Sequence, residues 1–307
     1  MQTHREYSWS EFARIPDTPS GRENGRTHGV CITRGGNVVV FHQAHNALVT
    51  YDSDGTILSA VGGDRWLGAH GLSRIVENGT EFLWLTDQFT GEVVKVTLDG
   101  ETIQAIDRPP CSPYDAGGKY SPTWAAQNPD NGEIWVADGY GASLVHRFSP
   151  GGTYRATLDG TEGAGRFSCP HGLGFRKASG GPELWITDRG NRRVVVYDAD
   201  GKYVRRTDVT HSPCTVDFHD DLVVIPELFT GVKILNADTL EVLAEIGANP
   251  DVTPDHRPDG WPNLAGTPFV TPGVFNSPHA ACFAPDGDIY VVEWIIGGRI
   301  TRLQRKP

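Results

Sequence analysis

The architecture of this chain follows from one repeated unit, which opens with Pro170-His171-Gly172-Leu173-Gly174-Phe175. The unit continues with Leu184-Trp185-Ile186-Thr187-Asp188 and, after a short gap, with Val194-Val195-Val196-Tyr197-Asp198. The same pattern recurs five more times, in units that open near Thr27, Ala69, Pro122, Pro213 and Pro278. Repeats of this length that hold only short strands are typical of a β-propeller. We therefore predict an all-β fold, a six-bladed β-propeller.

The repeat favours a single domain over residues 1–307, because one blade alone cannot bury its own faces. The 37 glycines and 21 prolines suit the many turns of such a fold. The last unit ends with residues 298–303, one strand short of the others. Residues 7–15 alternate apolar and polar side chains, as a strand does. We predict that this N-terminal strand completes the last blade and closes the ring.

The net charge of −11 and the pI of about 5.4 limit the partners of the protein. Nucleic-acid backbones and anionic membranes both attract basic surfaces, so neither is an expected partner. Residues 1–6 lack the apolar core of a signal peptide, and the five cysteines form no CxxC pair. These features predict a cytoplasmic protein with a small-molecule substrate, and they carry no signal for an oligomeric state. Cys31, Cys169 and Cys282 adjoin apolar strands and are expected to be buried, inert thiols.

The second position of each unit carries the most informative residues, in chain order His28, His70, Thr123, His171, Cys214 and His279. His70, His171 and His279 belong to the second, fourth and sixth units, which a pseudo-threefold axis relates in a six-bladed ring. Three imidazoles arranged in this way can bind one divalent ion and leave coordination positions open for water or substrate. A lone histidine would more simply bond to backbone at the channel rim. Three at alternate blades favour a catalytic metal site.

The remaining second positions leave alternatives open. His28 lies in the first unit, where it is a further metal ligand, a partner of a ligand, a general base or a channel-lining residue. Cys214 either binds the metal or packs, and its apolar character favours packing. Thr123 is expected to be a hydrogen-bonding wall residue.

Polar residues follow the second strand of each unit, on the same face as the histidines. Tyr140 in Asp138-Gly139-Tyr140 is a candidate general acid or base, and Arg189 is a candidate anion-binding residue. The repeated aspartates, Asp87 among them, more simply cap turns. Residues 247–275 form a long Pro- and Gly-rich connection that contains Trp261, and they are expected to be an ordered lid.

These motifs resemble a known family. The run Trp-Ile-Thr-Asp-Arg-Gly-Asn-Arg-Arg at residues 185–193 looks like an NHL-repeat propeller. From about residue 27 onward the chain more closely resembles the catalytic core of peptidyl-α-hydroxyglycine α-amidating lyase. The resemblance implies a zinc ion on His70, His171 and His279, with Tyr140 and Arg189 as essential residues. That family cleaves a carbinolamide C–N bond and releases an amide and an aldehyde acid.

Three positions depart from the family pattern. Gln43 in Phe41-His42-Gln43 stands where the family has a catalytic arginine, so the clamp for the substrate carboxylate is altered. Ala280 replaces an aspartate that helps to hold a structural calcium ion, so calcium is not expected here. Gly141 replaces a disulfide cysteine. The resemblance therefore supports a zinc site and does not imply a peptidyl-hydroxyglycine substrate.

The favoured interpretation is a metal-dependent lyase that breaks a C–N or C–O bond of a small polar hydroxylated substrate. Zinc is the first candidate for the ion, although iron, nickel, cobalt and manganese also suit three imidazoles. Beside Tyr140 and Arg189, the candidate catalytic set includes His28, Gln43 and His45, the last two with the 247–275 segment as determinants of specificity. A metal-dependent hydrolase or lactonase is the first alternative, and a non-catalytic NHL-type binding module is the second.

Overall fold

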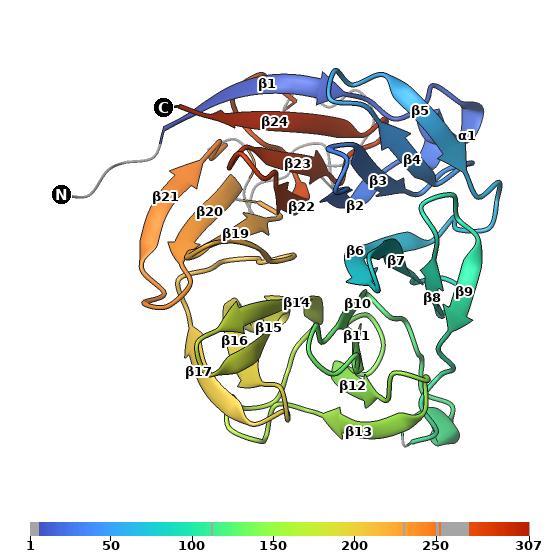
Figure 1. Cartoon of the computed structure of the whole chain (residues 1–307), viewed down its shortest axis with the longest axis vertical. Helices are drawn as coiled ribbons and strands as arrows, with labels where there is room; N and C mark the ends of the chain where they lie inside the picture. The colour runs from blue at the N-terminus through green and yellow to red at the C-terminus, as the bar shows by residue number, and fades with distance from the viewer. Residues whose placement is uncertain (1–5, 112, 230, 250–251, 253–269, 307) are drawn as a thin grey trace. The chain divides into compact units, whose positions relative to one another are not determined.

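The computed structural model describes residues 6–111, 113–229, 231–249, 252 and 270–306. The chain divides into two compact units, one of Met1–Leu67 with Val216–Pro307 and one of Gly68–Thr215. Each unit contains three four-stranded antiparallel sheets. The six sheets are the blades of an all-β, six-bladed β-propeller, so the predicted fold class is confirmed (Figure 1).

The unit Gly68–Thr215 holds the second, third and fourth blades. The second blade consists of β6 (Ala69–Glu77), β7 (Thr80–Asp87), β8 (Glu92–Val96) and β9 (Thr102–Ala105). The third consists of β10 (Trp124–Gln127), β11 (Ile134–Asp138), β12 (Leu144–Phe148) and β13 (Tyr154–Leu158). The fourth consists of β14 (Pro170–Ala178), β15 (Gly181–Asp188), β16 (Arg193–Asp198) and β17 (Tyr203–Thr207). Two short 3-10 helices, η1 (Tyr114–Ala116) and η2 (Arg189–Asn191), lie in the connections.

The other unit holds the first, fifth and sixth blades. The first blade consists of β2 (Thr27–Ile32), β3 (Val38–His42), β4 (Leu48–Tyr51) and β5 (Ile57–Val61). The fifth consists of β18 (Asp217–His219), β19 (Leu222–Glu227), β20 (Gly231–Asn236) and β21 (Val242–Ile246). The sixth consists of β22 (Pro278–Phe283), β23 (Ile289–Glu293), β24 (Arg299–Arg305) and β1 (Tyr7–Ala13).

The N-terminal strand completes the sixth blade, as the sequence predicts. Strand β1 pairs antiparallel with β24, with Trp9 opposite Leu303, so blue and red strands lie side by side in Figure 1. This pairing covers the edge that β24 would otherwise expose. A short helix, α1 (Pro19–Asn24), follows β1 and is capped by the Thr18 side chain, which accepts a hydrogen bond from the Gly21 amide.

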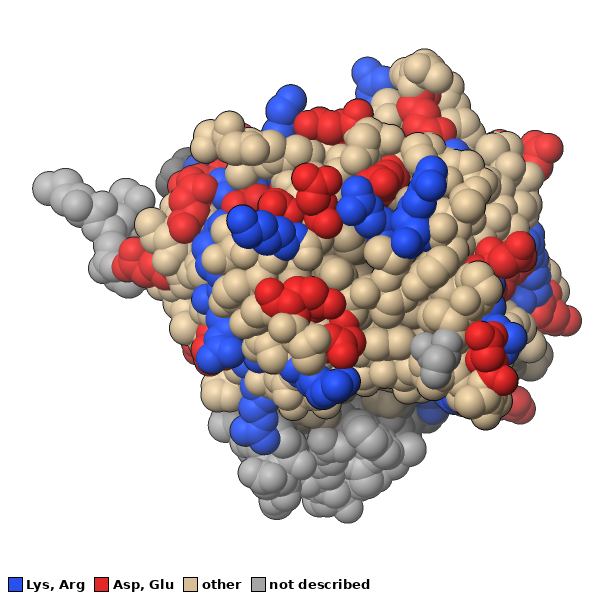
Figure 2. Space-filling view, turned by 90° about the horizontal axis from the view of Figure 1, so that it is seen from below, with Lys and Arg blue, Asp and Glu red and all other residues tan. Residues whose placement is uncertain are grey.

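The core lies between the faces of neighbouring sheets. In the unit Gly68–Thr215, Trp84 and Val93 of the second blade pack with Ile134, Val136 and Phe148 of the third. Strand β11 is buried along its whole length and β7 from Leu83 onward, which explains the apolar runs in these two strands. Acidic and basic side chains intermingle on the face shown in Figure 2. Within the described part of the chain, every helix is too short or too polar to cross a membrane.

Candidate functional site

The aspartates that end the second strands hold turns together. Asp87 accepts hydrogen bonds from the amides of Phe89, Thr90 and Gly68 at 2.8–2.9 Å. Asp138 accepts from the amides of neighbouring loops in the same manner, and it is fully buried. These contacts fit the turn-capping role predicted for the aspartates.

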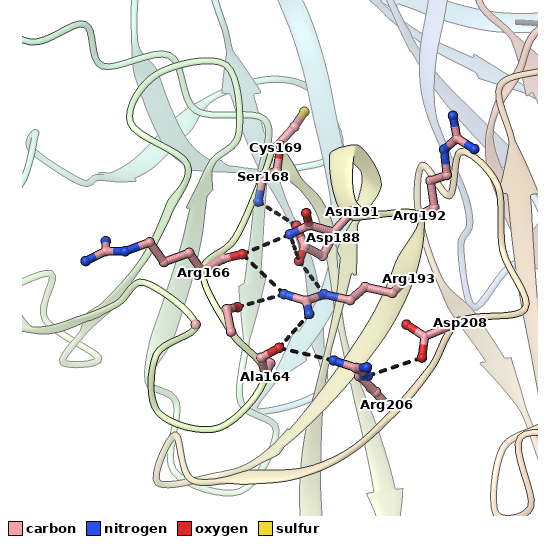
Figure 3. Close-up of polar contacts among 12 residues, drawn as sticks. Ala164, Arg166, Ser168, Cys169, Asp188, Asn191, Arg192, Arg193, Arg206 and Asp208 are labelled. Atoms are coloured by element: carbon pink, nitrogen blue, oxygen red, sulfur yellow. Dashed lines mark hydrogen bonds and ion pairs between the residues drawn. The ribbon is translucent and has the colours of Figure 1, made fainter.

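Asp188 likewise accepts hydrogen bonds, and it holds together the segments next to Arg189 and His171 (Figure 3). Its Oδ1 atom accepts from the Ser168 amide at 2.8 Å, and its Oδ2 atom accepts from Nε of Arg193 at 2.7 Å. The Arg193 guanidinium also donates to the carbonyl oxygens of Ala164 and Gly165 at 2.5 and 2.7 Å. The buried ion pair therefore ties the crossover before β14 to the turn after β15.

Four predicted site residues of the unit Gly68–Thr215 meet at one point. The Tyr140 hydroxyl lies 3.2 Å from Nε2 of His70 and 3.0 Å from Nε2 of His171. Arg189 donates from Nη2 to the same hydroxyl at 3.0 Å. The rings of His70 and His171 are 4.7 Å apart between centroids, and both histidines are fully buried. Histidines 101 positions apart in the sequence thus face one phenol oxygen.

Backbone carbonyls fix the tautomer of both histidines. Nδ1 of His70 lies 2.7 Å from the Thr123 carbonyl oxygen, and Nδ1 of His171 lies 2.8 Å from that of Cys214. A carbonyl oxygen only accepts, so Nδ1 carries the proton and Nε2 keeps its lone pair. Two neutral Nε2 atoms directed at one point form a donor set that zinc and other divalent transition metals accept. The residues present therefore fit the ion that the sequence predicts.

The glycine after each of these histidines is required by close packing. A Cβ atom on Gly71 would lie 2.6 Å from the Thr123 carbonyl oxygen, the partner of His70. A Cβ atom on Gly172 would lie 2.8 Å from the Thr215 Cα atom and against the Cys214 carbonyl. The His-Gly pair in the repeat thus lets each histidine approach the backbone of the next blade.

Burial and the facing cation set the electrostatics of the site. Burial raises the pKa of Tyr140 to about 12, although the Arg189 guanidinium opposes this rise. Burial alone would lower the pKa of Arg189, but the Tyr140 phenol and the thiols of Cys169 and Cys214 raise it. The guanidinium therefore stays charged. The site therefore presents one fixed positive charge beside a phenol that holds its proton.

Three non-glycine residues in the surrounding loops adopt positive φ angles, Ser143 at 58°, Cys169 at 57° and Arg192 at 58°. The Cys169 amide donates to Oγ of Ser143 at 3.1 Å, and the Arg189 amide donates to the Cys169 carbonyl at 3.1 Å. Such strained residues persist only where surrounding contacts hold them, and they gather at functional sites.

The expectation of a fully buried thiol is wrong for Cys169. Its side chain is only partly buried, and Sγ accepts from Nη2 of Arg189 at 3.5 Å. The left-handed backbone at Cys169 turns the side chain out of the strand direction and toward Arg189. The sequence carried no signal for this contact. Cys31 and Cys282 are buried, as predicted.

The other unit repeats the histidine arrangement. Nδ1 of His279 lies 2.8 Å from the His28 carbonyl oxygen, which fixes the same tautomer as in His70 and His171. The His28 ring lies 4.5 Å from that of His279 between centroids. His279 as the third ligand and His28 as a catalytic residue stay predictions of the sequence.

The predicted specificity residues occupy different environments. Gln43 is buried, and its backbone amide donates to the Arg26 carbonyl at 3.0 Å. The His45 side chain is 48% exposed, and Nδ1 lies 2.8 Å from Oδ1 of Asp64. Most of the predicted lid, residues 250–251 and 253–269, lies outside the described residues. The roles given to these residues stay predictions.

Part of the chain is similar in sequence to known amidating enzymes. The chain is 29% identical over 171 residues to peptidyl-glycine alpha-amidating monooxygenase B of Xenopus laevis. The match covers 53% of this chain but only 19% of the Xenopus protein, so the chain spans a minor part of that enzyme. The predicted resemblance to amidating enzymes is thus confirmed at the level of sequence similarity. No protein-family model matches the chain.

Solved structures share the fold. A streptogramin B lyase structure aligns with a TM-score of 0.62 and 15% identity, over 100% of both chains. A gluconolactonase from Xanthomonas campestris aligns with a TM-score of 0.65 and 13% identity, over 94% of this chain and 89% of its own. At these identities the likeness shows the propeller fold alone.

Proposed function

We propose that the chain is a metal-dependent enzyme of the lyase type that breaks a C–N or C–O bond in a small, polar, hydroxylated molecule. The observation that carries this proposal is the convergence of His70, His171 and Arg189 on the Tyr140 hydroxyl. Two lone-pair nitrogens, a phenol and a guanidinium at one buried point suit acid–base chemistry beside a cation. The sequence similarity to an amidating enzyme supports the lyase class.

His70 and His171 would hold the ion, with His279 as the predicted third ligand. A bound divalent ion would supply Lewis-acid polarisation of a substrate oxygen. Arg189 orients an anionic or polar group of the substrate through the donors that it does not give to Tyr140. Cys169 and Ser143 keep that guanidinium in place.

Tyr140 moves the proton. In a carbinolamide-like substrate, the Tyr140 hydroxyl gives its own proton to the departing nitrogen as the C–N bond breaks. The Tyr140 oxygen takes the proton of the substrate hydroxyl in the same step, as that hydroxyl oxygen becomes a carbonyl. Tyr140 ends as it began, so the reaction consumes no water, oxidant or reductant. A C–O substrate follows the same path, with an oxygen leaving group.

Metal content tests the proposal directly. Elemental analysis of the untagged protein should find about one equivalent of a transition metal, and His171→Ala should lose it. His219→Ala is the matched control, because His219 is a partly buried histidine outside the site, and it should keep the metal. Wild-type protein without metal after reconstitution with zinc, cobalt, nickel, manganese or iron contradicts the proposal.

Hydrolysis is the second candidate, because an ion with open positions also activates water and the chain shares its fold with a gluconolactonase. Turnover in ¹⁸O-labelled water separates the two reactions. A hydrolase incorporates the label into its product as the bond breaks, whereas the lyase reaction involves no water. The label must be sought in a carboxylate or alcohol product, since aldehydes exchange oxygen with water.

A further inference from the structure

The blade that carries Tyr140 holds its turn by different chemistry from the fourth and sixth blades. In the fourth blade, Asp188 pairs in register with Arg193 and binds its guanidinium. In the sixth blade, Glu293 pairs in register with Arg299 and likewise binds the guanidinium. In the third blade, Leu144 occupies the position of these arginines, opposite Asp138. The carboxylate beside Tyr140 therefore has no arginine opposite it.

The side-chain partner of this carboxylate is a neutral tyrosine from a distant part of the chain. Tyr114 in η1 donates its hydroxyl proton to Oδ2 of Asp138 at 2.6 Å. The Tyr114 oxygen lies 2.7 Å from Nε2 of His146, whose Nδ1 atom lies 2.9 Å from Oγ1 of Thr157. The hydroxyl of Tyr154 follows at 2.8 Å from the same Thr157 oxygen. These contacts form one continuous chain, which we name the third-blade relay: Tyr154, Thr157, His146, Tyr114 and Asp138.

Only one set of proton positions satisfies the relay. Tyr114 gives its single proton to the carboxylate, so its oxygen must accept a proton from Nε2 of His146. Nδ1 of His146 must then accept from Thr157, which accepts from Tyr154. Burial lowers the pKa of His146 to about 3, and burial raises the pKa of Tyr114, so both groups stay neutral. This His146 tautomer is the opposite of the one in His70 and His171.

The relay ends where the Tyr140 turn is built. The same Asp138 carboxylate accepts from the amides of Ser121 and Ala142, each at 2.6 Å. The Ser121 carbonyl in turn accepts from the Tyr140 amide at 3.3 Å. Asp138 and His146 are fully buried, and Tyr114 is 2% exposed, so water does not replace these contacts. The orientation of the carboxylate thus sets the course of the backbone on both sides of Tyr140.

We propose that Tyr114 and His146 are positioning residues for Tyr140, acting through the Asp138 carboxylate in place of the arginine that the fourth and sixth blades use. This inference rests on the proposed function for the meaning of Tyr140 as a reacting group. A neutral partner holds the turn without placing a fixed positive charge on the Asp138 carboxylate.

The tautomer of His146 is the first test, and it needs neither metal nor substrate. Imidazole ¹⁵N spectra of the full chain, with His146 assigned by a His146→Gln variant, should show the proton on Nε2 of His146 from about pH 5 to 9. A proton on Nδ1, or a charged ring in this range, overturns the proposal.

The second test follows Tyr140 itself. With 3-fluorotyrosine incorporated at position 140, Tyr114→Phe should shift or broaden the ¹⁹F resonance, and exchange of the Ala142 amide should accelerate by about tenfold. Tyr197→Phe, which removes the hydroxyl of another buried tyrosine, should change neither. His146→Gln should retain more of the wild-type signal than His146→Leu, because the amide can still donate to Tyr114.

An unchanged ¹⁹F resonance and unchanged Ala142 exchange in Tyr114→Phe refute the positioning role. If His146→Leu and His146→Gln behave alike while Tyr114→Phe has its effect, His146 is only a packing residue and its part of the proposal fails. A chain without metal or turnover would contradict the proposed function and leave these spectroscopic outcomes readable.

Discussion

The ion pair of Asp188 and Arg193 gives the sharpest prediction for stability. Arg193 is 7% exposed and Asp188 is fully buried, so neither charge can turn to solvent when its partner is removed. In Arg193→Leu, Asp188 keeps the hydrogen bonds from Ser168 and Asn191 but loses its counter-ion (Figure 3). Breaking a buried pair from one side costs about 3–5 kcal/mol, because the remaining charge stays desolvated.

The carbonyls released by this change add less. Residues 165 and 166 are exposed, so their carbonyl oxygens can bond to water after the guanidinium is gone. The Ala164 carbonyl belongs to a buried residue, but it also accepts from Nη1 of Arg206 at 3.4 Å and so keeps a partner (Figure 3). We therefore expect Arg193→Leu to lower the free energy of unfolding by about 4 kcal/mol, within the range for a broken buried pair.

Urea unfolding of four proteins in a double-mutant cycle measures this value. Asp188→Asn alone leaves the Arg193 cation buried and should cost a similar amount, whereas the double variant should cost clearly less than the sum of the single changes. Surface pairs supply the control. Arg22→Leu breaks the exposed pair with Asp17 and should cost less than about 1 kcal/mol. Additive single changes, or a loss below about 1 kcal/mol in Arg193→Leu, would show that the pair does not hold these loops.

Three further predictions concern the site and its surroundings. Tyr140→Phe should keep the metal measured by elemental analysis but reduce turnover by about 10²–10⁴-fold, and turnover near the wild-type level would exclude Tyr140 as the proton carrier. Gly172→Ala should cost about 1–3 kcal/mol in urea unfolding, because the new Cβ atom meets Thr215 and Cys214, whereas Gly180→Ala has open space and should cost little. Burial lowers the pKa of His42 to about 4, so the folded state binds fewer protons than the unfolded state below the unfolded pKa of about 6.5. Stability should therefore fall as the pH drops from about 6.5 to 4, and His42→Gln should flatten that slope; an identical slope in the variant would assign the acid sensitivity to other groups.

Much of the fold could be predicted because the repeat is a local signal. Alternating and continuous apolar runs of residues define strands, and their recurrence implies that each unit buries its faces against the next. The missing fourth strand of the last unit pointed to β1, and the pairing of Trp9 with Leu303 bears this out. The sequence did not predict helix α1, because six residues are too few to show a helical period of apolar side chains.

The candidate site was only partly visible in the sequence. The recurrence of histidine at one position of the unit, and of turns after the second strand, placed His70, His171, Tyr140 and Arg189 together in advance. Repeat position carries this information because equivalent residues of neighbouring blades occupy equivalent places. The sequence could not show that Cys169 faces Arg189, because that contact depends on a left-handed backbone angle that a cysteine rarely adopts.

The chain's own pattern of residues thus determined the blades, their order and the positions at which reactive side chains gather. Tertiary structure alone decided which nitrogen of each histidine carries the proton, since carbonyls of the next blade make that choice. It also decided that Asp138 accepts a hydrogen bond from Tyr114, 24 residues away, whereas Asp188 accepts one from Arg193, five residues away. Periodicity records where backbone strands lie, whereas a buried hydrogen bond depends on distances and angles between side chains that no repeat specifies.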